Sequence, residues 1–112
     1  MPANTTDTPV LDTIALITAA SIENCTLAPR DLMLARIAAL VAMDAPPASY
    51  LLNAGTAADV GITLDDVEGI LTAVAPIVGT PRVTAAVGNI ARALGFAIAA
   101  IEAEDDLTIT KG

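Results

Sequence analysis

Residues 80–101, TPRVTAAVGNIARALGFAIAAI, carry the most regular apolar pattern of the chain. Apolar residues recur here at alternating spacings of four and three, as in the heptad seam of a helix: Val83, Val87, Ile90, Leu94, Ala97 and Ile101. Thr80 is a typical N-cap and Pro81 a typical first helical residue, so the spacing predicts a helix that begins at Pro81. Gly88 and Gly95 fall on a second stripe, where a neighbouring backbone has room to approach.

Four shorter helices are predicted upstream, with bounds at residues 9–23, 29–43, 45–60 and 64–78. The segment 29–43 is apolar nearly all round, which is typical of a helix in the middle of a bundle. The bounds rest on residues that begin or end helices: Pro29 and Asp44 as starts, Gly61 and Gly79 as ends, and Thr63 with Asp66 as a capping box.

No stretch alternates polar and apolar residues for long enough to suggest a sheet. The sequence therefore predicts an all-α fold of about five helices. We expect residues 9–107 to form a single domain, between a disordered N-terminal tail, 1–8, and a C-terminal tail, 108–112.

The composition favours self-association and argues against several classes of partner. Of the 112 residues, 54% are hydrophobic but only 2% are aromatic. A chain this small buries only about 60–70% of its unfolded surface, so we expect apolar patches that copies of the chain cover. The net charge of −8 argues against nucleic acid and against anionic membrane surfaces. The sequence shows no signal peptide and no apolar stretch long enough to cross a bilayer, so the expected location is the cytoplasm.

Several segments in the first three quarters of the chain carry a family resemblance. They are Leu27-Ala28-Pro29-Arg30, the apolar run 37–43, Val60-Gly61-Ile62-Thr63, Asp65-Asp66-Val67 and Pro76-Ile77-Val78-Gly79-Thr80-Pro81-Arg82. In order and spacing they resemble the carboxymuconolactone decarboxylase family, which includes the alkylhydroperoxidase D-like peroxidases. The resemblance implies an alkylhydroperoxidase D-like helical bundle that assembles as a trimer or a hexamer.

The chain departs from this family at the residues that carry its chemistry. Peroxidase members have a C-x-x-C-x-x-x-H motif, and counting back from Gly61 places Pro46, Ser49 and Asn53 at its two cysteines and its histidine. The family's proton-relay glutamate falls at Met33. Decarboxylase-like members tend to keep the histidine, and this chain has none. A dithiol peroxidase needs two thiols, whereas Cys25 stands alone, so we interpret it as an ordinary half-buried cysteine.

The remaining candidate site residues are Arg36, Ser49 and Asn53. Arg36 lies in the most apolar predicted helix and needs a carboxylate, a helix C-terminus, an anionic ligand or solvent. Ser49 and Asn53 share one helix face, and with Tyr50 they could line a small polar pocket. No metal or cofactor site is predicted, because histidines, an acidic oxygen cage and a phosphate-binding glycine loop are all missing.

Two classes of function are open at this point. In the first, the protein is non-enzymatic and acts through assembly or by binding a small anionic molecule or a partner helix. In the second, it is a decarboxylase-like lyase or isomerase that uses Arg36, Ser49 and Asn53 without a histidine. The missing nucleophile, base and relay favour the first class.

Overall fold

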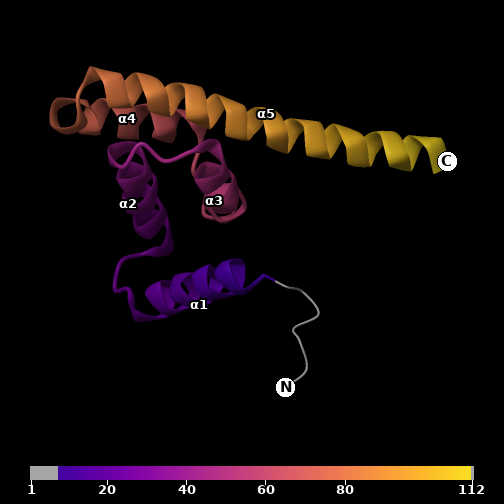
Figure 1. The fold of residues 1–112 in the computed structure, drawn as a ribbon, viewed down its shortest axis with the longest axis horizontal. Helices are drawn as coiled ribbons and strands as arrows, with labels where there is room; N and C mark the ends of the chain where they lie inside the picture. The colour runs from indigo at the N-terminus through magenta and orange to yellow at the C-terminus, as the bar shows by residue number, and fades with distance from the viewer. Residues whose placement is uncertain (1–7, 112) are drawn as a thin grey trace.

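The computed structural model describes residues 8–111, with side chains beyond Gly95 described only at Ile98 and Ala103. Five helices follow one another along this range: α1 (Pro9–Asn24), α2 (Pro29–Ala42), α3 (Pro47–Asp59), α4 (Leu64–Val78) and α5 (Thr80–Lys111). Residues 8–111 contain no strand, so the predicted all-α fold of five helices is confirmed (Figure 1). Residues 108–111, expected in a tail, continue α5, and the N-terminal tail predicted over 1–8 lies outside the described residues except for Thr8.

The start of α4 is fixed by the predicted capping box. The Asp66 amide donates to the Thr63 hydroxyl at 3.2 Å, and the Thr63 amide donates to the Asp66 carboxylate at 2.8 Å. Each residue thereby satisfies a backbone donor that the first turn of a helix leaves unpaired. The prediction for Thr63 and Asp66 is confirmed.

Two helices end in the same left-handed turn, although only one of them has a glycine there. After α3, Gly61 has a φ of 81° and Ile62 donates its amide to the Ala57 carbonyl. After α2, Asp44 has a φ of 55° and Ala45 donates to the Leu40 carbonyl. Both are Schellman-type ends, in which the residue after the left-handed one closes back on the helix. Gly61 was predicted in this role.

The predicted role of Asp44 as the N-cap of the third helix is wrong. That helix begins at Pro47, with Pro46 as its N-cap residue and no side-chain cap. A residue before proline is driven out of the helical region, so the Pro46–Pro47 pair delays the start of the helix. Similarly, Thr80 is the first residue of α5 and not its N-cap, because Gly79, with a φ of 86°, precedes the helix.

The core forms around α2, which packs against α3, α4 and α5. This confirms the central position predicted for the most apolar helix. Met33 and Val41 of α2 are fully buried, and Val41 lies in a cluster with Ala45, Tyr50, Ala86 and Ala93. Because α5 contributes two alanines to this cluster, the helices approach closely but enclose few large side chains.

Large parts of the apolar surface stay uncovered in the single chain. None of the residues of α1 is buried, and Figure 1 shows α1 set apart from α4 and α5. On the seam of α5, Val87 and Leu94 remain 53% and 38% exposed. The radius of gyration is 16.5 Å, against about 13 Å for a compact domain of this size. Within residues 8–111, no helix combines the length and apolar character that crossing a bilayer requires.

Candidate functional site

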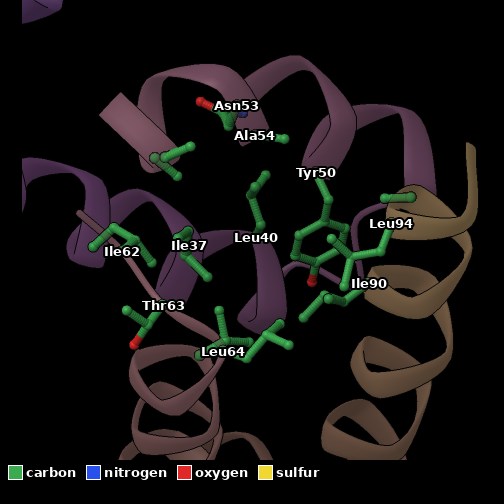
Figure 2. Close-up of a pocket in the computed structure, with 14 residues that line it drawn as sticks. Ile37, Leu40, Tyr50, Asn53, Ala54, Ile62, Thr63, Leu64, Ile90 and Leu94 are labelled. Carbon is green, nitrogen blue, oxygen red and sulfur yellow. The ribbon is translucent and has the colours of Figure 1, made fainter. Parts of the chain in front are cut away.

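An open apolar hollow of about 270 Å³ lies where α2, α3, the start of α4 and α5 meet (Figure 2). Its walls are mainly aliphatic side chains, with Tyr50, Asn53 and Thr63 as the side chains that carry polar atoms. The lining residues are Ile37, Leu40, Tyr50, Asn53, Ala54, Ala57, Ala58, Ile62, Thr63, Leu64, Val67, Ile90, Ala93 and Leu94. This lining has no lysine, arginine, carboxylate or thiol, so it offers no thiolate nucleophile, no carboxylate or amine base and no counter-ion for an anion.

Tyr50 is the polar group of this hollow that is left without a partner. Its side chain is only 8% exposed, and its hydroxyl oxygen is buried and forms no hydrogen bond with any described residue. In Figure 2 the ring descends from α3 among the lining side chains, with the hydroxyl directed away from α3. Burial, and secondarily the negative charge of Asp44, raises the pKa of the Tyr50 hydroxyl. The group is therefore a neutral hydrogen-bond donor at physiological pH.

The structure places Asn53 in the lining of the hollow but does not bring the three predicted site residues together there. Asn53 donates from Nδ2 to the Ser49 backbone carbonyl at 2.8 Å, whereas the Ser49 side chain is not part of the lining. Arg36 points elsewhere, donating to the Ser21 hydroxyl at 3.1 Å and more weakly to the Thr18 carbonyl at 3.5 Å, both on α1. Arg36 thus links α2 to α1.

The positions that the sequence resemblance aligns with reactive residues, Met33 and Pro46 among them, hold residues with structural roles. Met33, at the place of the relay glutamate, is 0% exposed and packs in the core. Pro46, at the place of the first cysteine, begins the turn into α3. Cys25 is half-buried just after α1 and does not line the hollow.

The family-like motif residues instead connect helices. Arg30, at the start of α2, forms an ion pair of 2.7 Å with Asp66 in the first turn of α4. The hydrogen bond from the Thr63 backbone amide, followed by that from Arg30, holds the pKa of the Asp66 carboxyl below its usual value. Arg82, at the start of α5, donates to the carbonyl of Ala42, the last residue of α2. These arginines join helices that are far apart in the sequence.

The apolar walls of the hollow are what reasoning from the sequence missed. The sequence pattern indicated only that these side chains belong to apolar helices, and no motif indicated that they border one open space. They include Ile37, Leu40, Ile90 and Leu94. Tyr50, the sole tyrosine of the chain, was predicted to line a small polar pocket with Ser49 and Asn53; it does line the hollow with Asn53, but the predicted pocket was polar and the observed walls are mainly apolar.

Comparison with known proteins yields no relative: no family model, no curated protein and no solved structure matches this chain.

Proposed function

We propose that this protein acts by self-association, as a non-redox homo-oligomer related to the carboxymuconolactone decarboxylase family. The observation that carries the proposal is that α1 is a full-length helix with no buried residue. Its large apolar side chains are 44–72% exposed: Val10, Leu11, Ile14, Leu16, Ile17 and Ile22.

An uncovered α1 has no evident source of stability within one chain. It has 16 residues, and isolated helices of that length are marginal in water even when they are rich in alanine. Several of its residues are β-branched, which lowers helix propensity further. Fully burying a Leu or Ile side chain contributes about 1.5–3 kcal/mol. A second copy that covers this face would supply what the monomer lacks.

The proposed relationship to the family rests on the motif residues that connect helices. Arg30 with Asp66, and Arg82 with the end of α2, give a physical reason for an arginine after each of the two family-like prolines. Such residues stabilise a bundle and need no reactive group nearby. A trimer or a hexamer, the states that the resemblance implies, is the assembly we propose.

The alternative class, a lyase or isomerase that uses Arg36, Ser49 and Asn53, has less support from the geometry. Those three groups would have to face one substrate, whereas Arg36 donates to α1 and Asn53 borders the hollow. A peroxidase would need a second thiol, which the chain lacks. We therefore expect no turnover of peroxide by the purified protein in the presence of a dithiol reductant.

Light scattering coupled to size-exclusion chromatography tests the assembly. The wild-type chain should elute as a multiple of 11.3 kDa at micromolar concentration. The double variant Leu16→Lys/Ile17→Lys should shift the mass toward the monomer, with the α2–α5 core unaffected because α1 buries no residue. Ala73→Lys, a charge added at an exposed position of α4, is the matched control and should keep the wild-type mass. A wild-type particle of 11.3 kDa would overturn the proposal.

A further inference from the structure

The hollow is large enough for a small molecule, and its walls are mainly apolar. An apolar cavity of about 150 Å³ takes up benzene and stays free of water, and the volume here is about 270 Å³. A buried water needs two to four polar partners. Asn53 donates one Nδ2 hydrogen to the Ser49 carbonyl and the Thr63 hydroxyl donates to Asp66, so part of the polar lining is already hydrogen-bonded within its own helix turn.

The Tyr50 hydroxyl is the buried donor without a partner, and it sets the chemistry that the hollow would recognise. Leaving a buried hydroxyl without a partner costs free energy, and a ligand acceptor would remove that cost. An anionic ligand is disfavoured, because no lining residue is cationic and the chain carries a net charge of −8. This differs from the anionic ligand expected from the sequence.

We propose that this hollow binds a neutral, mainly apolar molecule about the size of a substituted benzene ring, which accepts one hydrogen bond from the Tyr50 hydroxyl. Entry is from the open side, where Leu64 and Leu94 are 64% and 38% exposed. The hydroxyl is covered in the empty hollow, so contact requires a rotamer change of a neighbouring side chain.

Three probes of similar size separate the components of this proposal: acetophenone, with a ring and one acceptor; ethylbenzene, with a ring alone; and benzoate, an anion. Binding is measured by calorimetry and by ligand-observed NMR on the full chain. Wild type should bind acetophenone about 2- to 10-fold tighter than ethylbenzene, the worth of one net hydrogen bond. Benzoate should bind at least about ten-fold more weakly than acetophenone.

Substitutions at two lining residues, Tyr50 and Ala54, test whether the probes bind in this hollow. Tyr50→Phe should abolish the preference for acetophenone and keep ethylbenzene binding, because only the hydroxyl is lost. Ala54→Trp should take up much of the hollow and weaken binding of both neutral probes, whereas Ala73→Trp, at an exposed position of α4, should bind like wild type.

The proposal is overturned if neither neutral probe binds saturably, if benzoate binds best, or if Tyr50→Phe keeps the preference for acetophenone. A second copy of the chain that closes the hollow would give the first of these results. Particle masses measured on the same samples report on the assembly separately, so either proposal can fail without the other.

Discussion

The substitution Tyr50→Phe should raise the free energy of unfolding of the ligand-free protein, although it removes a polar group that belongs to the core. The hydroxyl is buried, the side chain is 8% exposed, and no partner lies within hydrogen-bonding distance among the described residues. A buried polar group without a partner costs about 1–3 kcal/mol. Phenylalanine keeps the ring and its contacts in the cluster with Val41 and Ala86, so no cavity offsets the gain.

Urea unfolding followed by far-UV circular dichroism measures this effect without depending on tyrosine fluorescence. The comparison is made at matched protein concentrations, since the stability of an oligomer depends on concentration. An increase of about 1 kcal/mol corresponds to a melting temperature roughly 4–8 °C higher for a domain of about this size. Tyr50→Ala, which also removes the ring, should instead lose about 3–5 kcal/mol. A Tyr50→Phe protein less stable than wild type would refute the reasoning, because the hydroxyl would then have a stabilising partner.

Three further substitutions test the core and the helix ends, each by denaturant unfolding. Met33→Ala should cost about 2–5 kcal/mol, whereas Met43→Ala, at a side chain that is 75% exposed, should change stability by less than about 0.5 kcal/mol; equal losses would contradict the described core. Asp44→Gly should stabilise by up to about 1 kcal/mol and Asp44→Ala should not, because glycine alone adopts a φ of 55° without a steric penalty. Since the folded-state pKa of Asp66 is lowered, its contribution to stability is fully present above the usual pKa of an aspartate and is lost as the pH falls from there through the lowered folded-state pKa. Wild type should therefore lose stability on acidification faster than Asp66→Asn, and parallel pH profiles would exclude the capping role.

The helix order could be predicted because local residues determine it. Pro29 and Pro47 lie at helix starts, and Gly61 and Gly79 adopt the left-handed conformation at helix ends. These effects depend only on residues within one helical turn, so helix starts and ends can be predicted from the sequence. Asp44 was misassigned because aspartate suits both an N-cap and a left-handed turn, and the following prolines, not its own side chain, decide between the two.

The site could not be predicted in the same way, because it depends on which helix faces meet. The sequence pattern places Ile37 in a helix that is apolar nearly all round and Ile90 on the heptad seam of another helix, but it does not say that both border the same hollow. Arg36 illustrates the limit. Its place in an apolar helix indicated that it needs a partner, yet the partner is a hydroxyl on α1, a helix whose position no local signal determines.

The heptad seam of α5 and its neighbouring alanines, Ala86 and Ala93, connect the sequence pattern with the uncovered surface. The core takes up Ala86 and Ala93, 1% and 5% exposed, which lie one residue before the heptad positions Val87 and Leu94. Because the helix turns its small residues inward, its larger seam residues stay at the edge of the core, where Leu94 also borders the hollow. Because α5 packs closely through its alanines, the heptad residues Val87 and Leu94 remain partly exposed in the monomer. That exposed apolar surface, together with the uncovered α1, is the physical reason to expect a second copy.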